Sequence, residues 1–348
     1  MSAAPRQSSF VVEVTQRCQH DCLHCYNVWK NEAPYPRGEL GTAETLALLG
    51  RLLDQTGASL VTLSGGEPLL RPDLGEIVSF LADRGAAMNL VSNGGLINAK
   101  ALDRIGRGRI SIFELPLLGP EREVHDRLSG AEGAFDGVTA AITELKLAGE
   151  RVVVVFVATR LNLGRFGETL ELAIALGADG LMLNRFNPGG RGREHLALLQ
   201  PSPTELVLAL DLAERVSRDH ELPISCAIPM PPCLVDTSRY QRLGFGFCAA
   251  GTERAYYTMD PLGNLRPCNH SPTILGNLAE RSFAELAGSA CLRAFVAARP
   301  RFCAGCSQEA LCLGGCKAAA EVCSGSAGEM DPFLSAHRGE ARRPSVTS

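Results

Sequence analysis

The sequence predicts an α/β fold in which a parallel sheet curls toward a barrel and is followed by a cysteine-rich C-terminal region. Two observations support this prediction. Between residues 10 and 186, short apolar runs alternate with helical patterns, and several of these runs are continuously apolar, as in strands covered on both faces. After the proline-rich segment 228–233 the alternation stops and cysteines become frequent.

Each expected strand is followed along the chain by an expected helix. The expected strands are Phe10–Val14, Leu60–Leu63, Met88–Val91, Ile110–Leu115, Val152–Ala158 and Leu181–Phe186. The expected helices are Ala43–Thr56, Asp73–Arg84, Ala99–Ile105, Phe135–Ala148, Phe166–Leu176 and Pro201–His220. Right-handed crossovers would make the sheet parallel, and ligands bind such sheets at the carboxyl ends of the strands.

Composition excludes several classes of partner. The net charge of the 348 residues is −4 and no basic run stands out, so we expect neither nucleic acid nor a membrane surface as a partner. The first nine residues lack the apolar segment of a signal peptide, and no run is long enough to span a bilayer. Thirteen cysteines without an export signal indicate metal ligation in a reducing compartment, the cytoplasm.

Three cysteines follow the first expected strand at the spacing CxxxCxxC: Cys18, Cys22 and Cys25. Three thiolates on a four-iron cluster leave one iron without a protein ligand, and an open iron can bind a small molecule. Two alternatives remain. The cysteines could form a Cys3His zinc site with His20 or His24, or they could be unrelated buried thiols.

A second motif, Ser64-Gly65-Gly66-Glu67-Pro68, follows the second expected strand. Its two glycines allow the backbone to approach a ligand closely, and Glu67 adds an acceptor. The combination of CxxxCxxC and GGEP at successive strand ends resembles the radical S-adenosylmethionine (SAM) enzymes, and the resemblance covers nearly the whole chain.

The resemblance implies that Cys18, Cys22 and Cys25 hold a 4Fe–4S cluster whose open iron chelates the methionine part of SAM. Tyr26 would lie near the adenine. The loop that starts at Ser64 would bind SAM, with the backbone of Gly65, Gly66 and Glu67 receiving the amino group. Reductive cleavage would yield a 5′-deoxyadenosyl radical, which takes a hydrogen atom from the substrate.

Further candidates for SAM binding follow the later strands. Ser92 and Asn93 resemble the family's polar pair near the ribose, and Asn162 is a similar candidate. Each could instead be a turn or capping residue. Arg185 is also a cofactor-binding candidate. Both Arg185 and Arg191 could pair with a carboxylate at this rim or be solvated.

The fourth expected strand departs from the family pattern, because relatives often carry a Ser-x-Asp-Gly-like run where this chain has residues 111–116. Glu114 in this run could face the substrate or bind a basic residue. We interpret His125-Asp126 as a loop pair.

The C-terminal region contains seven cysteines at characteristic spacings. Cys248 is followed by Gly263 and Cys268, and then by Cys303, Cys306, Cys312, Cys316 and Cys323. A hairpin over residues 256–264, with its turn near 260–264, would bring Cys248 and Cys268 together. Two zinc ribbons are the alternative to iron–sulfur clusters.

The spacing resembles the SPASM extension of radical SAM enzymes, which carries two auxiliary clusters. The resemblance implies a first cluster on Cys248, Cys268 and Cys316, and a second on Cys303, Cys306, Cys312 and Cys323. The first lacks a fourth ligand, for which Cys233 is the candidate; otherwise that iron is open. Cys226 and Cys291 are left over, and Cys291 is predicted to be a buried thiol.

The full prediction is a partial (β/α)6 TIM-like barrel with a C-terminal SPASM extension and three 4Fe–4S clusters. The expected divisions are an N-terminal segment 1–9, a barrel 10–220, a connector 221–247, an auxiliary-cluster domain 248–325 and a disordered tail 326–348.

The resemblance implies an enzyme that abstracts hydrogen from a peptide or protein side chain and so oxidises, crosslinks or epimerises it. A separate peptide-recognition protein and an electron donor such as flavodoxin or ferredoxin are the expected partners. One alternative is a radical SAM enzyme that acts on a small molecule, such as a tetrapyrrole side chain or a sugar. Another is a non-catalytic, zinc-stabilised binding protein.

Overall fold

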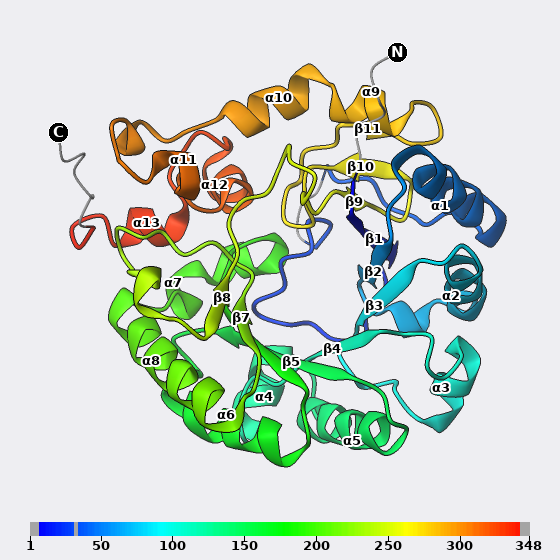
Figure 1. Cartoon of the computed structure of the whole chain (residues 1–348), viewed down its shortest axis with the longest axis horizontal. Coiled ribbons are helices and arrows are strands. Elements are labelled where there is room, and N and C mark those ends of the chain that lie inside the picture. Colours follow the sequence, from blue (N-terminus) through cyan, green and yellow to red (C-terminus); the bar gives the residue numbers. More distant parts are fainter. Residues whose placement is uncertain (1–6, 31–33, 342–348) are drawn as a thin grey trace.

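The computed structural model describes residues 7–30 and 34–341, and its centre is a curved sheet surrounded by helices (Figure 1). The six predicted strands are present as β1 Ser9–Thr15, β2 Leu60–Gly65, β3 Ala87–Val91, β4 Ile112–Pro116, β5 Val152–Ala158 and β6 Gly180–Arg185. Five further short strands are β7 Ile224–Cys226, β8 Leu243–Phe245, β9 Thr258–Met259, β10 Asn264–Arg266 and β11 Gly276–Asn277.

The strands form one open sheet of eleven, in the order β11-β10-β9-β1-β2-β3-β4-β5-β6-β7-β8. Neighbours from β1 to β8 are all parallel, which confirms the predicted partial barrel. The segment predicted as a connector, 221–247, contributes β7 and β8, so the sheet extends further than the six-unit prediction.

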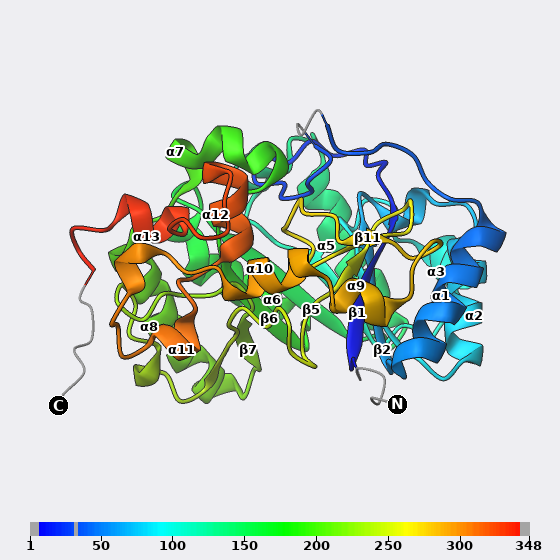
Figure 2. The same ribbon diagram turned by 90° about the horizontal axis from the view of Figure 1, so that it is seen from above.

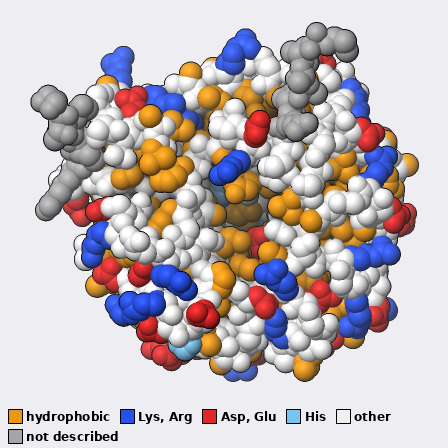
Figure 3. Space-filling model, in the orientation of Figure 1, with side chains coloured by type: hydrophobic (Ala, Val, Ile, Leu, Met, Phe, Trp, Pro, Cys, Tyr) orange, Lys and Arg blue, Asp and Glu red, His pale blue; other side chains and the backbone are white. Residues whose placement is uncertain are grey.

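Helices cover the outside of this sheet, as Figure 1 shows. They are α1 Thr42–Thr56, α2 Leu74–Asp83, α3 Ala99–Ile105, α4 Arg122–Ser129, α5 Ala134–Leu147, α6 Phe166–Ala175, α7 Leu196–Leu199 and α8 Pro203–His220. The core lies between helices and sheet and includes Phe10, Leu63, Phe113 and Phe156, each at most 1% exposed. Alternate residues of β4 and β5 are half-buried on the opposite face, which lines the inside of the curved sheet. Figure 3 shows the molecule hollowed at the centre of this ring.

Helix α4 was not predicted, and the interpretation of His125-Asp126 as a loop pair is wrong. His125 lies in α4, is 1% exposed, and its Nδ1 accepts a hydrogen bond from the backbone N–H of Leu118 at 3.1 Å. Asp126 accepts from the N–H groups of Gly133 and Phe135 and so connects α4 to the start of α5. The helix escaped detection because it is short and mostly polar.

The predicted hairpin is formed by β9 and β10, which pair antiparallel. Because β9 also pairs in parallel with β1, the C-terminal region continues the same sheet. A buried ion pair between Glu13 of β1 and Arg266 of β10 joins the two regions. The chain then forms α9 Phe283–Ala287, α10 Ala290–Ala297, α11 Glu309–Cys312, α12 Lys317–Ser324 and α13 Pro332–Ala336. In Figure 1 these helices form an arc, coloured orange to red, from the β1 side toward the β8 side.

The prediction of a disordered tail is wrong for residues 326–341. Helix α13 begins with Asp331 as a side-chain cap and Pro332 in the first turn, and Phe333 and Leu334 are at most 1% exposed. The serine-rich composition concealed this short apolar segment. Residues 1–6 of the expected N-terminal segment and 342–348 of the tail lie outside the described residues. Within the described ranges, none of the helices has the length and apolarity needed to cross a membrane.

Candidate active site

The three N-terminal cysteines lie together in the connection from β1 to α1, which runs along the upper edge of the molecule in Figure 2. Burial raises the pKa of the Cys22 thiol, and the neighbouring Cys25 and Cys18 raise it further. The backbone N–H of His20 donates to Cys18, and that of Asn27 donates to Cys25. In both cases the donor lies two residues after the cysteine. Such bonds favour thiolates, so this donor set fits an iron–sulfur cluster.

Lys30 supports the same loop. Its ammonium donates to the carbonyl of His20 at 2.7 Å and acts electrostatically to lower the pKa values of Cys18, Cys22 and Cys25. Among residues 7–30 and 34–341, no three His, Cys, Asp or Glu side chains are grouped closely enough to hold one metal ion.

The glycines of the second motif approach the cysteine loop itself. A Cβ on Gly65 would overlap the carbonyl oxygen of Thr15, and one on Gly66 would overlap that of Arg17. The N–H of Gly66 donates to Thr15 at 2.8 Å, and that of Glu67 donates to Arg17 at 2.8 Å. The expectation that close approach serves a ligand is therefore corrected in part, because the glycines first allow two backbone segments to meet.

Glu67 is completely buried and links this motif to the end of β3. Its carboxylate accepts hydrogen bonds from Ser92 Oγ at 2.9 Å, from the N–H of Asn93 at 2.8 Å and from the N–H of Leu69 at 3.1 Å. Burial raises the pKa of Glu67 to about 7, although these hydrogen bonds oppose the shift. Ser92, at 2% exposure, therefore directs its hydroxyl at Glu67, which corrects its expected role as a ribose contact.

Asn93 lies beside the cysteine loop. Its Nδ2 is 3.8 Å from Cys18 Sγ, and its Oδ1 accepts from Gln19 Nε2 at 3.0 Å. The side chain is only half-buried, so it remains available to a ligand at the cysteines. Asn93 therefore has the geometry of a ligand contact. Ser92 instead supports the loop through its hydrogen bond to Glu67.

Tyr26 faces the C-terminal region. Its ring lies 4.2 Å from that of His270, measured between centroids, and its hydroxyl accepts from Asn269 Nδ2 at 3.3 Å. Burial raises the pKa of Tyr26 to about 12, while a hydrogen bond with Ser64 acts in the opposite direction. Ser64 and Tyr26 are thus brought together.

Two predicted cofactor contacts are structural instead. Asn162 is completely buried; its Oδ1 accepts from Thr159, and its Nδ2 donates to the carbonyls of Leu118 and Val157 at 2.9 Å each. Arg185, 1% exposed, forms a buried ion pair with Asp331. Their hydrogen-bonding groups are directed at the protein, so the assignment of both residues to SAM is corrected.

Arg191 forms an ion pair with Asp21 of the cysteine loop. Of the two alternatives expected for Arg191, the structure shows the pair with a carboxylate. Glu114 lies on the inner face of β4 and accepts a hydrogen bond from Asn89 Nδ2 at 3.3 Å rather than from a basic residue. Burial raises the pKa of Glu114. This carboxyl group is well situated for a substrate inside the barrel.

Cys248, Cys268 and Cys316 lie near one another and are called the first thiol group. Burial raises the pKa of Cys268 to about 12, with further contributions from Cys316 and Cys248, and the N–H groups of His270 and Ser271 donate to its sulfur. Asn187 Nδ2 lies 3.4 Å from Cys316 Sγ and 3.1 Å from Nδ1 of His270. Since His270 stacks on Tyr26, this group is connected by side-chain contacts to the N-terminal cysteine loop.

A second thiol group consists of Cys233, Cys303, Cys306 and Cys312, which line one pocket together with Pro232, Phe302 and Leu334. Burial raises the pKa of Cys233 to about 11. The charges of Cys312, Cys303 and Cys306 also raise it, by smaller amounts. The structure therefore places Cys233 with this group and not with the first. Cys323 does not line the pocket; its charged neighbours are Arg193 and Asp331.

The remaining cysteines differ in exposure. Cys226 lies in the core, whereas Cys291 is exposed on α10, so its prediction as a buried thiol is wrong.

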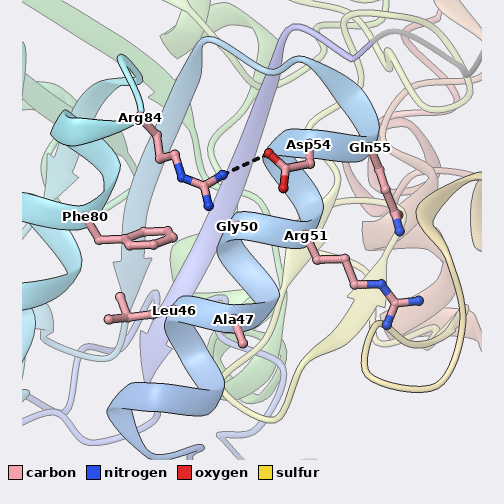
Figure 4. Close-up of a pocket in the computed structure, with 8 residues that line it drawn as sticks. All are labelled: Leu46, Ala47, Gly50, Arg51, Asp54, Gln55, Phe80 and Arg84. Atoms are coloured by element: carbon pink, nitrogen blue, oxygen red, sulfur yellow. Dashed lines mark hydrogen bonds and ion pairs between the residues drawn. The ribbon is translucent and has the colours of Figure 1, made fainter.

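Figure 4 shows a separate surface pocket between α1 and α2, away from the strand ends. There Arg84 pairs with Asp54 at 2.8 Å and lies over the ring of Phe80, so its charge is already matched.

The comparison with protein families gives a match between the radical SAM superfamily and residues 12–173, which span β1 to α6. This part of the chain therefore belongs to the radical SAM superfamily. The chain is similar to an AdoMet-dependent heme synthase of Methanosarcina barkeri, with 28% identity over 96% of this chain and 97% of the relative. It is also similar to a PqqA peptide cyclase of Xanthomonas euvesicatoria, with 29% identity over 95% of this chain and 88% of the relative.

Solved structures share the fold of this chain. SuiB of Streptococcus suis bound to S-adenosylmethionine has a TM-score of 0.73 at 15% identity, covering 93% of this chain and 76% of SuiB. The enzyme anSMEcpe with AdoMet and the Cp18Cys peptide has a TM-score of 0.73 at 15% identity, covering 96% of this chain and 95% of anSMEcpe. The likeness includes the cysteine-rich region, in agreement with the predicted SPASM extension.

The sequence did not predict several residues of this candidate site. Asn187, His270 and Asp331 were not predicted to belong to it. His270 follows Cys268 by two positions, and that proximity was the available signal. Asp331 precedes a proline, a typical helix-start pattern, but its partner Arg185 lies 146 positions away.

Proposed function

We propose that this enzyme reductively cleaves SAM at a 4Fe–4S cluster held by Cys18, Cys22 and Cys25, and that it abstracts a hydrogen atom from a peptide or protein side chain. The observation that carries the proposal is the convergence of the cysteine loop with the GGEP motif and Asn93 at one end of the barrel. When bound, the cluster and SAM would supply a 5′-deoxyadenosyl radical.

The chain's own residues orient these groups. Backbone N–H groups of His20 and Asn27 stabilise the thiolates, and the GGEP backbone holds the cysteine loop against β2. Glu67 fixes the N–H of Asn93, which leaves the Asn93 side chain beside Cys18. Tyr26, held by His270 and Asn269, would border the adenine. The interior of the barrel, with Glu114 and Asn89, would receive the substrate.

The two thiol groups of the C-terminal region would hold two auxiliary 4Fe–4S clusters. A substrate radical formed by hydrogen abstraction must lose an electron to become an oxidised product, and a nearby cluster can accept it. The contacts from Tyr26 through His270 and Asn187 to Cys316 support a short path between the two sites.

The name of the PqqA peptide cyclase relative, together with the peptide-bound structures of SuiB and anSMEcpe, supports a peptide substrate. We propose an electron donor such as flavodoxin or ferredoxin and a separate peptide-recognition protein as partners. The many cysteines support a reducing, cytoplasmic location.

A tetrapyrrole is a second candidate substrate, because the heme synthase relative matches 96% of this chain and 97% of its own length. Sequence similarity alone does not separate the two, since the identities are 28% and 29%.

The test is anaerobic purification followed by reduction with SAM and mass spectrometry for 5′-deoxyadenosine. Wild-type enzyme should form this product and hold about twelve irons, while the triple variant Cys18→Ala, Cys22→Ala, Cys25→Ala should form none and hold about eight. Deuterium from a labelled peptide encoded beside the gene should enter 5′-deoxyadenosine. Transfer from a labelled tetrapyrrole but from no peptide would favour the second candidate. Cleavage by the triple variant at the wild-type rate would refute the assignment.

A further inference from the structure

We propose that Cys233, and not Cys323, supplies the fourth thiolate of the second auxiliary cluster, together with Cys303, Cys306 and Cys312. This inference rests on the proposed function, because it concerns a ligand of a cluster proposed there. It changes the ligand set that the cysteine spacing implies, and it makes the segment after the barrel part of the auxiliary site.

The four thiols line one pocket with mainly apolar walls, formed by Pro232, Phe302 and Leu334 among others. A 4Fe–4S cluster whose irons are all bound by the protein is held by four thiolates. The backbone N–H groups of Gly314 and Gly315 donate to Cys312, the same arrangement that surrounds the N-terminal cysteines. The pocket thus has both the number of sulfurs and the amide donors that a cluster needs.

The chain between the barrel and Cys233 is held in place. Arg185 Nε donates to the carbonyl of Pro229 at 2.7 Å, and Met230 is 2% exposed. The N–H groups of Leu234 and Val235 both donate to the carbonyl of Pro231 at 3.0 Å, which forms a turn around Cys233. Because this turn is anchored on both sides, Cys233 is presented to the pocket without a rearrangement of the barrel.

Cys323 occupies a different place. It lies near the end of α12, whose cap is Cys316, and seven residues of helix separate the two by about 10 Å. One of its charged neighbours, Arg193, lies in η3, the 3-10 helix Gly190–His195, which contacts α12. Cys316 therefore lies with the first thiol group, whereas Cys323 lies about two helical turns further along α12 and outside the pocket of the second group.

The first experiment counts iron in a background that lacks the SAM cluster (Cys18→Ala, Cys22→Ala, Cys25→Ala), so that all iron is auxiliary. The background should hold about eight irons per chain. Adding Cys323→Ser should leave that number unchanged. Adding Cys233→Ala or Cys233→Ser should remove at least one iron and, where three irons remain, produce the EPR signal of a 3Fe–4S cluster. Circular dichroism checks that each variant is folded.

The second experiment uses the wild-type holoenzyme and needs no variant. Anaerobic alkylation with iodoacetamide, followed by peptide mass spectrometry, should label the exposed Cys291 and also Cys323, while Cys233 stays protected. Chelation of the iron should make Cys233 reactive. Protection of Cys323 with labelling of Cys233 in the holoenzyme would overturn the proposal, as would loss of iron on changing Cys323 alone.

Different results would refute this proposal and the proposed function. If the background variant holds no iron while the wild type still cleaves SAM, both auxiliary clusters are refuted, and this proposal with them, but the SAM chemistry stands. If the wild type neither binds iron nor cleaves SAM, the proposed function itself is refuted.

Discussion

Arg185 and Asp331 form an ion pair in which both side chains are 0% exposed. Arg185 ends strand β6 and also donates to Pro229, ahead of Cys233, while its guanidinium carbon lies 5.0 Å from the ring centroid of Phe333. Asp331 also accepts from the N–H of Cys316 at 2.7 Å. One buried pair therefore connects the barrel to both thiol groups of the C-terminal region.

Breaking this pair should destabilise the protein strongly. Asp331→Asn or Arg185→Met leaves one charge buried without its partner, and we expect each to lower the free energy of unfolding by about 3–5 kcal/mol. The double variant should lose less than the sum, because no unpaired charge remains. Urea unfolding measures all three. Asp136→Asn, which removes an exposed pair with Arg122, is the control and should change stability by less than about 0.5 kcal/mol. Strict additivity in the cycle would contradict the coupling.

Variants of Asn162 and Asn93 should affect different properties of the enzyme, stability for Asn162 and SAM binding for Asn93. Asn162→Ala leaves buried backbone groups unpaired and should cost about 3 kcal/mol of stability, with SAM affinity unchanged in the folded enzyme. Asn93→Ala should weaken SAM binding about tenfold, equivalent to about 1.4 kcal/mol, with little effect on stability. Urea unfolding and anaerobic SAM titration, followed by absorbance, measure the two quantities. An Asn162→Ala enzyme that is stable but does not bind SAM would reverse our assignment.

Gly66→Ala should remove the SAM cluster. The added Cβ would overlap the Arg17 carbonyl, so the cysteine loop must move, at a cost of about 1–3 kcal/mol or more. We expect iron content to fall by about four per chain. Gly164→Ala is the matched control, because a Cβ there meets nothing within 4 Å, and it should keep its iron and stability. Full iron loading of the Gly66→Ala enzyme would show that the loop tolerates displacement.

Glu67→Gln should change how stability depends on pH. Burial raises the pKa of Glu67 from 4.5 to about 7, so the folded protein binds a proton that the unfolded chain releases. This contribution to stability is fully present below pH 4.5 and is lost as the pH rises through 7. Between pH 5 and pH 8, wild-type stability should therefore fall relative to Glu67→Gln by up to roughly 3 kcal/mol. Urea unfolding at both pH values tests this, and Glu253→Gln, at an exposed position, should show no such change. A constant difference between the wild type and Glu67→Gln would contradict the raised pKa.

The strands were predictable to within about two residues because each is a short apolar run with glycine or polar residues at its ends. Helix α8 began two residues later than predicted, at Pro203, where Ser202 and Glu205 form a capping box. Helix α4 and the short strands β7 and β8 were missed, since segments of three to eight residues with few apolar side chains carry little periodicity. Helix α13 was missed because its apolar segment is only five residues long and lies in a serine-rich tail.

Some residues of the candidate site could also be predicted from the sequence, and others could not. Cys18, Cys22 and Cys25 were identified because their spacing is local and a short loop must bring them together. Ser92, Asn162 and Arg185 were assigned to the cofactor from their position at strand ends, which does not reveal the direction of a side chain. Their partners Glu67, Leu118 and Asp331 lie 25, 44 and 146 positions away, respectively.

The sequence by itself determined the chemistry, because cysteine spacing and the order of strands and helices are written in neighbouring residues. Only the tertiary structure decided which distant cysteines share a pocket and which polar groups are available to a ligand. Burial and hydrogen bonding depend on contacts between segments that the chain order separates, and the buried pair of Arg185 and Asp331 is formed by such a contact.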